Sequence, residues 1–158
     1  MEEMIARISP SPFRRVLAIG ILLVLGGLLI YLALARPPAE LIWQAFLLLT
    51  GGLVLYLADQ VRRATALTIE LSDGRIFDSA GRELCRLDEI KSIERGAFAF
   101  KPSNGFLIHL KSRKPRVWAP GLWWRTGRRV GVGGVTPASQ AKFMSEMIAY
   151  QLRDNPPD

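Results

Sequence analysis

Two long apolar runs lie next to each other near the N-terminus, and they constrain this chain more than any other feature. Residues 16–35 carry no charged side chain, and residues 39–58 carry only Glu40. An α-helix rises about 1.5 Å per residue, so each run is long enough to cross a hydrocarbon core of about 30 Å. Only residues 36–38, Arg-Pro-Pro, separate the two runs. The sequence therefore predicts a transmembrane hairpin with spans at 16–35 and 39–58.

The first run also has features of a cleavable signal sequence. Arg14 and Arg15 precede it, and residues 33–35, Ala-Leu-Ala, have the small side chains of a cleavage site. The run is longer than the apolar core of a signal sequence, which spans about 7–15 residues. A second span also follows at once. We therefore expect an uncleaved anchor.

The positive charges near the spans predict the orientation of the hairpin. Those before the first span and after the second are Arg7, Arg14, Arg15, Arg62 and Arg63. The turn at 36–38 has Arg36 alone. Because positive residues are retained in the cytoplasm, we expect a cytoplasmic segment at 1–15, an extracytoplasmic turn and both termini inside. The expected location is the inner membrane, with two spans.

Small residues fall at similar depths in both spans. They are Gly26, Gly27, Gly51 and Gly52. Close packing drives helix association in lipid, and glycine lets two backbones approach. We expect these residues to pack the hairpin; the alternative is that they dock a partner membrane protein or a second copy of the chain.

The remaining chain is long enough for one small domain, predicted at residues 64–153. Leu67, Ile69 and Leu71 alternate with polar residues, as in a half-buried strand, and Asp73-Gly74 is a favoured hairpin turn. A return strand begins at Ile76. Further strands are predicted at residues 83–87, 90–95, 106–111, 116–119, 122–125 and 128–132.

The end of the chain reads as an amphipathic helix. Met144, Met147, Ile148 and Leu152 recur at helical spacing after Thr136-Pro137. We expect a flexible tail at 154–158. Antiparallel strands followed by one helix predict an α+β domain, in which the helix covers an open face or end of the sheet.

This order of elements resembles the bacterial pleckstrin-homology-like (PH-like) membrane proteins. The resemblance lies in residues 67–69 (Leu-Thr-Ile), 73–74 (Asp-Gly), 87–93 (Leu-Asp-Glu-Ile-Lys-Ser-Ile) and 131–137 (Gly-Val-Gly-Gly-Val-Thr-Pro). It implies a transmembrane hairpin, a small antiparallel barrel and a closing helix. It also implies a binding or scaffolding role rather than an activity. The segment 111–129 departs from that pattern because it is long, basic and rich in tryptophan.

Residues that commonly carry catalysis are sparse. His109 is the only histidine and Cys85 the only cysteine, so neither a histidine pair nor a cysteine metal site can form. The glycine-rich residues 127–134 lack the Lys-Ser/Thr of a phosphate-binding loop. We therefore predict a protein that is not an enzyme and needs no cofactor or metal.

The segment 111–129 is the most suggestive part of the domain. No Asp or Glu occurs from Arg95 to Ser145, and the whole chain carries a net charge of +7. Its candidate contact residues for lipid or a partner are Lys111, Arg113, Lys114, Arg116, Trp118, Trp123, Trp124, Arg125, Arg128 and Arg129. Cations gain about 1 kcal/mol each near an anionic leaflet, and tryptophan prefers the membrane interface. The alternative is that the tryptophans form core and the cations an ordinary solvated face.

These observations predict a membrane-anchored binding or scaffolding protein. Its cytoplasmic domain would contact anionic lipid headgroups of the inner leaflet or a partner protein. Nucleic acid is not expected as a partner, because the domain is tethered to the membrane. The alternative function is an accessory or assembly subunit of a larger inner-membrane complex, docked through the hairpin.

Overall fold

The computed structural model describes residues 3–96, 102–154 and 156. The chain forms two compact units. One is a helical hairpin at residues 12–63. The other is a domain that combines the chain up to Ser11 with the chain from Ala64 onward.

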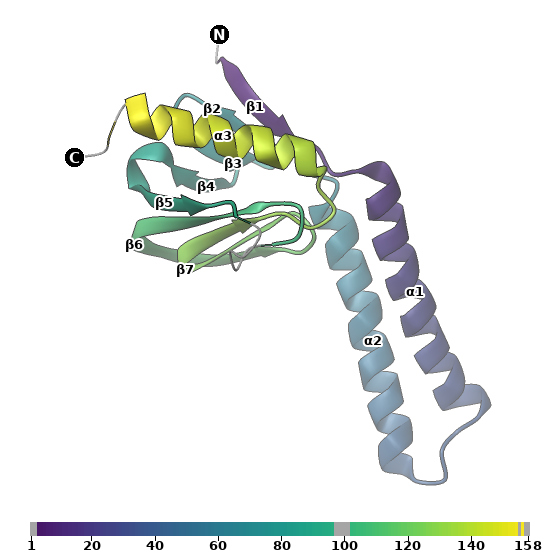
Figure 1. Ribbon diagram of the computed structural model, residues 1–158. Coiled ribbons are helices and arrows are strands. Elements are labelled where there is room, and N and C mark those ends of the chain that lie inside the picture. The colour runs from purple at the N-terminus through teal and green to yellow at the C-terminus, as the bar shows by residue number, and fades with distance from the viewer. Residues whose placement is uncertain (1–2, 97–101, 155, 157–158) are drawn as a thin grey trace. The chain divides into compact units, whose positions relative to one another are not determined.

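The hairpin consists of α1 (Pro12–Ala35) and α2 (Leu41–Ala64) (Figure 1). Both helices are long and apolar enough to cross a membrane. The helix α2 extends beyond the predicted span to Ala64, and this last part is polar. There, Asp59 pairs with Arg62 at 2.6 Å and with Arg63 at 2.8 Å, at the spacing that places side chains on one side of a helix.

The two helices approach each other closely at Gly26 and Gly51. A Cβ atom built on Gly26 would lie 3.2 Å from the Gly51 carbonyl oxygen, and one on Gly51 would lie 3.1 Å from the Gly26 carbonyl oxygen. Gln44 adds a hydrogen bond by donating from Nε2 to the Ala33 carbonyl, at 2.9 Å. In contrast, Cβ atoms on Gly27 and Gly52 would meet nothing within 4 Å. Only one glycine of each predicted pair therefore packs the hairpin.

The domain contains two antiparallel sheets and a helix (Figure 1). The first sheet has the order β1-β2-β3-β4, with strands Met4–Ile8, Ile69–Ser72, Arg75–Asp78 and Glu83–Arg86. The second has the order β5-β6-β7, with strands Ile90–Glu94, Phe106–Ala119 and Trp123–Val132. The short 3-10 helix η1 (Leu87–Glu89) joins the sheets, and α3 (Ala138–Asp154) closes the domain.

The first strand corrects the predicted organisation of the chain. Residues 1–15 were expected to form a separate N-terminal segment, but β1 pairs with β2, with Ile8 opposite Ile69. Ala6 and Ile8 are buried in the domain core. The pairing is invisible in the sequence pattern, because the whole hairpin separates the two strands and no turn signal joins them.

The strands β6 and β7 form one hairpin that folds back on itself. Ile108 lies opposite Val130 near its base and Trp118 lies opposite Trp124 near its tip, and the register shifts between these pairs. The bend lies at residues 111–114 of β6 and at Gly127 of β7, which has a φ of 59°. The tip then meets the base, because the Gly133 amide donates to the Leu122 carbonyl at 2.9 Å. The short strands predicted at 116–119, 122–125 and 128–132 are thus parts of two continuous strands.

The helix α3 packs as its periodicity predicts. It buries Met144 and Ile148, and Met147 and Leu152 are partly buried against the same core. The helix packs against β1, and the Ser9 amide near the end of that strand donates to Gln140 Oε1 at 2.8 Å. It extends to Asp154, the first residue of the predicted tail; residues 155, 157 and 158 lie outside the described residues.

Candidate functional site

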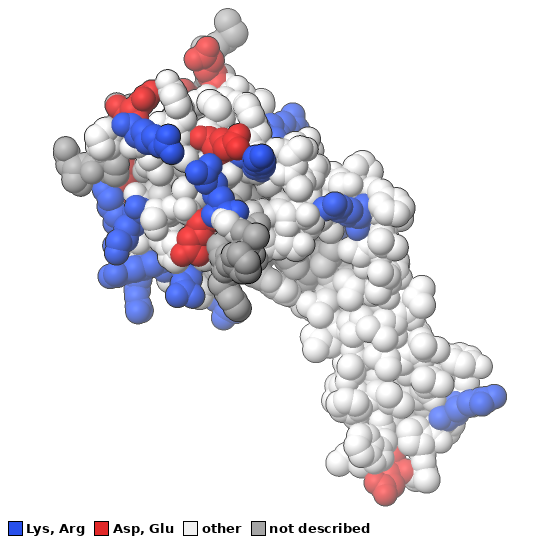
Figure 2. Space-filling view, viewed as in Figure 1, with Lys and Arg blue, Asp and Glu red and all other residues white. Residues whose placement is uncertain are grey.

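A cluster of exposed basic side chains lies at the bend of the β6–β7 hairpin. We call it the basic corner and define it as Lys111, Arg113, Arg116, Arg128 and Arg129, all of them exposed. In Figure 2, Lys and Arg side chains gather at the lower left of the view, over the part of the domain where Figure 1 shows β6 and β7. The bend brings residues from both strands to one place. A shifted register on β6 also leaves residues 110–113 opposite a shorter stretch of β7, as in a β-bulge.

One predicted contact residue, Trp123, belongs to the core instead. Its side chain is 1% exposed, and its Nε1 donates a hydrogen bond to Asp78 Oδ2 at 3.1 Å. The guanidinium carbons of Arg82 and Arg125 lie 5.5 and 6.0 Å from the ring centre, within the range of cation–π attraction. Trp123 cannot reach a lipid headgroup, because its ring is enclosed.

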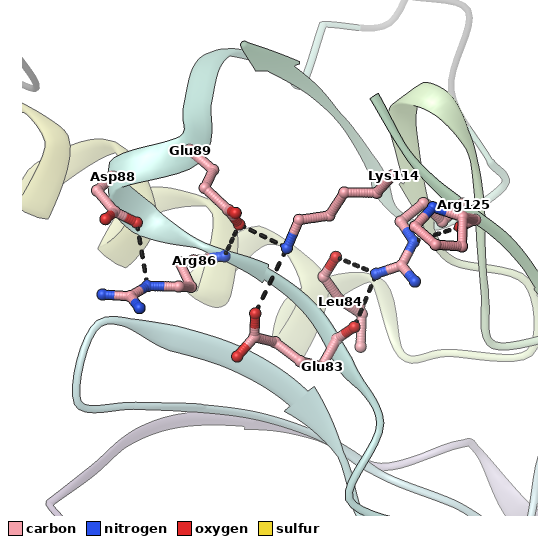
Figure 3. A network of polar contacts seen from close by, with 8 residues as sticks. Glu83, Leu84, Arg86, Asp88, Glu89, Lys114 and Arg125 are labelled. Atoms are coloured by element: carbon pink, nitrogen blue, oxygen red, sulfur yellow. Dashed lines mark hydrogen bonds and ion pairs between the residues drawn. The ribbon is translucent and has the colours of Figure 1, made fainter. Parts of the chain in front are cut away.

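Arg125 is also unavailable to a ligand. It is 9% exposed and donates from Nε to the Pro115 carbonyl at 2.8 Å. Its Nη1 donates to the carbonyls of Glu83 and Leu84 at 2.9 and 3.0 Å (Figure 3). Arg125 therefore joins β7 to β6 and β4. Strand alternation is consistent with the burial of Arg125, because residues two apart share a face and Trp123, two residues earlier, is buried.

Lys114 lies at the bend but is engaged by two carboxylates. Its Nζ lies 2.7 Å from Glu89 Oε2 and 3.4 Å from Glu83 Oε1 (Figure 3). Desolvation raises the pKa of Glu89, but the hydrogen bond and charge of Lys114, together with the Arg86 amide, outweigh it and hold the pKa below its ordinary value. Lys114 thus links the bend to β4 and η1 by ion pairs. The direction of its side chain could not be predicted from strand alternation, because the register of β6 shifts at this residue.

The two remaining tryptophans differ in exposure. Trp118 is 51% exposed and lies two residues beyond Arg116 on β6, about 7 Å along an extended strand and on the same face. Trp124, opposite Trp118, is half-buried and packs on Gly131; a Cβ atom on that glycine would overlap the indole side chain. Of the three tryptophans that the sequence grouped with the cations, the structure therefore leaves Trp118 exposed beside Arg116, whereas Trp123 is buried and Trp124 is half-buried.

The single histidine and the single cysteine are engaged in or buried within the domain. The His109 ring pairs with Glu94, with 2.9 Å between Nε2 and Oε1. Cys85 is buried, and desolvation raises the pKa of its thiol to about 12. Among the described residues, no group of three or more His, Cys, Asp or Glu side chains could hold a metal ion.

Comparisons of this chain with family models, with curated proteins and with solved structures find no match.

Proposed function

We propose that this protein is a membrane-anchored, non-enzymatic binding module, and that its basic corner contacts anionic lipid headgroups. The observation that carries the proposal is the exposure of five cations at one bend, in a stretch of sequence without acidic residues. Each cation near an anionic leaflet gains about 1 kcal/mol. Five together would hold the domain against its membrane, and the attraction would weaken as salt screens it.

Insertion of the hairpin is supported by where its apolar side chains lie. In the most apolar 18-residue segment of each helix, 11% of the residues are buried. A core helix of a soluble protein would bury most residues of such a segment instead. Exposed apolar side chains on this scale need lipid around them. The basic residues flanking the hairpin favour an inner-membrane protein with a cytoplasmic domain.

The strand β1 supports an anchor over a cleaved signal sequence. Cleavage after Ala35 would remove β1 from the protein. Ile8, which is fully buried in the core of the domain, would go with it. The domain would then lose a strand of its first sheet and expose part of its core to water.

Short connections hold the domain at the membrane. Residues 9–11 join β1 to α1, and residues 65–68 join α2 to β2. A chain of four residues reaches at most about 14 Å. The order of a hairpin, a small antiparallel domain and a final helix also supports the resemblance to PH-like membrane proteins, and we propose that fold for the domain.

The test measures the environment of the basic corner in bilayers of different charge. Ser112 is exposed between Lys111 and Arg113, so a nitroxide attached to Ser112→Cys reports on this surface. Cys85 stays unlabelled because it is buried. The full chain is reconstituted in vesicles of phosphatidylcholine alone or mixed with phosphatidylglycerol. We expect the nitroxide to become less accessible to a water-soluble relaxant in the anionic vesicles, and salt to reverse the change.

A matched pair of variants separates this contact from a general charge effect. Arg128→Glu with Arg129→Glu should abolish the change. Arg75→Glu with Lys91→Glu alters the net charge equally on exposed positions of β3 and β5, and should leave it intact. Equal accessibility in both kinds of vesicle would overturn the proposal.

A second candidate is an accessory subunit docked through the hairpin. Gly27 and Gly52 favour it, because nothing in the hairpin lies within 4 Å of a Cβ atom at either position. A partner helix could therefore approach closely there. Gly27→Leu with Gly52→Leu should then release a protein that co-purifies with the native chain in mild detergent. Retention of every companion by the double variant would count against this candidate.

A further inference from the structure

Trp118 is an exposed ring on a part of the domain that is otherwise firmly packed. It is 51% exposed, whereas the next residue, Ala119, and Leu122 after the turn are both buried. The Leu122 amide closes this turn by donating to the Ala119 carbonyl at 3.1 Å. We call residues 118–124 the β6–β7 tip, because they join the two strands. The fold therefore holds one large apolar ring in contact with solvent, on a backbone that the core fixes in place.

The β6–β7 tip lies beside the residue from which the domain continues into α1. The Gly121 carbonyl accepts from the Val135 amide at 3.0 Å, and the Val135 carbonyl accepts from the Ser11 amide at 2.8 Å. Ser11 is the last residue before α1. Hydrogen-bonded backbones lie about 5 Å apart, and the chain from Trp118 to Gly121 spans about 10 Å at most. The backbone of Trp118 is therefore within about 20 Å of Ser11.

The start of α1 indicates the level of the bilayer surface in the proposed topology. The apolar run begins at Val16, five residues after Ser11, or about 7 Å along a helix. The headgroup layer on each side of the hydrocarbon core is about 5–7 Å thick. Ser11 would therefore lie at the level of the headgroups when α1 crosses a membrane. Gly121, two hydrogen-bonded neighbours away, would lie within about 10 Å of that level.

The charges around Trp118 favour a lipid surface as the partner of its ring. Arg116, two residues earlier, shares its face of β6. No Asp or Glu occurs from Arg95 to Ser145, so neither strand of the β6–β7 tip carries an acidic side chain. Phe143 on α3 is equally exposed but lies three residues from Glu146, on the same side of the helix. An indole beside a guanidinium, without carboxylates, suits an interface at which rings meet headgroups and cations meet phosphates.

We infer that Trp118 is an aromatic anchor that lies in the headgroup region of the inner leaflet, near the start of α1. The inference rests on the proposed function, because Trp118 shares a face with Arg116 of the basic corner. It adds a second kind of attraction. Salt screens the attraction of the cations to anionic lipid, whereas the preference of an indole for the interface does not depend on lipid charge. The ring is about 17 Å from Arg113 along β6, so the strand lies along the membrane surface.

The experiment locates the ring by quenching tryptophan fluorescence with brominated lipids. The full chain carries Trp43→Phe, which removes the tryptophan of the helical hairpin, and it is reconstituted in phosphatidylglycerol mixed with brominated phosphatidylcholine. Of the other tryptophans, Trp123 is enclosed and Trp124 is half-buried. We expect bromine near the headgroup end of the acyl chains to quench several-fold more than bromine near their free ends. Adding Trp118→Phe should remove most of this quenching.

A matched set of variants tests whether the ring helps to hold the domain at the membrane. The readout is the salt concentration that reverses the change in accessibility of the nitroxide at Ser112→Cys in anionic vesicles. Trp118→Ser should lower this concentration several-fold, and Trp118→Tyr, which keeps a ring suited to the interface, should restore most of it. Phe143→Ser removes an equally exposed ring from α3 and should leave the concentration unchanged.

The outcomes separate the anchor from the basic corner. Quenching that is absent, or that persists after Trp118→Phe, would overturn the anchor even where the nitroxide at Ser112→Cys still responds to lipid charge. Quenching that depends on Trp118, together with a nitroxide that ignores lipid charge, would support the anchor and overturn the basic corner as the lipid contact. The quenching profile is recorded with the native ring at position 118, so it tests the anchor even if Trp118→Ser fails to fold.

Discussion

The side chain of Arg125 lies among carbonyl oxygens because its guanidinium can donate to three of them from one position. A buried charge is tolerated only when its hydrogen bonds are made. Asp78 meets the same requirement: it is fully buried, its Oδ1 accepts from the amides of Ala80 and Arg82, and its Oδ2 accepts from Trp123 and the Arg82 side chain. These two residues hold the turn after β3 and the strand β4 against β7.

Replacing Arg125 by lysine should destabilise the domain. A lysine amine cannot reproduce the planar donors that serve Pro115, Glu83 and Leu84, so at least one buried carbonyl loses its partner. We expect Arg125→Lys to cost about 2–3 kcal/mol of unfolding free energy. Denaturant unfolding of the full chain in detergent, followed by tryptophan fluorescence, measures it. The exposed control Arg116→Lys should change stability by less than about 0.5 kcal/mol; equal effects would contradict the structural role of Arg125.

The ion pair of Lys114 should make stability depend on pH. The folded pKa of Glu89 is lowered from its ordinary value of 4.5, so the stabilisation is present above that value and is lost as the pH falls through the folded pKa. We expect Lys114→Met to cost about 1–2 kcal/mol at pH 7, and the difference from the native chain to shrink in acid. Unfolding curves over a range of pH test this. Lys91→Met, at an exposed position on β5, should show no such pH dependence.

At the scale of elements, β1 and the folded β6–β7 hairpin complete the domain. The strand β1 extends the first sheet and packs against α3. The β6–β7 hairpin contributes Trp123, Ile108 and Val130 to the core, and the exposed side chains of the basic corner lie at its bend. One pair of strands therefore supplies both core and candidate site, because alternate residues on a strand face opposite sides.

Loss of one side chain from β1 should weaken the whole domain. Ile8 is fully buried, so Ile8→Ala leaves a cavity and removes apolar contacts, at a cost of about 2–4 kcal/mol. Met4 on the same strand is 54% exposed, so Met4→Ala should have a much smaller effect. Thermal unfolding of the full chain in detergent distinguishes the two variants. A loss at Ile8 no greater than that at Met4 would show that β1 does not belong to the core.

At the scale of the whole molecule, the pairing of β1 with β2 fixes a relation between the ends of the hairpin. These strands precede α1 and follow α2, so both ends of a membrane-spanning hairpin would have to lie on one side of the membrane. Two crossings satisfy this condition, whereas one crossing does not. The positive-inside bias then favours the cytoplasm for that side.

Labelling from outside the cell tests this topology. Single cysteines at Glu3→Cys and Arg153→Cys should both be protected from an impermeant maleimide in intact cells, and both should react after lysis. Glu40→Cys, between the helices, should react in intact cells. Reaction of only one of the two domain positions would be incompatible with the β1–β2 pairing.

The sequence by itself determined the parts of this protein that local patterns control. Apolar length set the two helices, alternation and Asp73-Gly74 set the early strands, and helical spacing set the buried side of α3. The tertiary structure alone decided which charges and rings are exposed. Pairing between distant strands brought β1 into the first sheet, and the folding of one hairpin buried Trp123 and Arg125 while leaving Arg128 and Arg129 outside. The physical reason is that a residue's exposure depends on the neighbours that the fold brings to it, and those neighbours are remote in the chain.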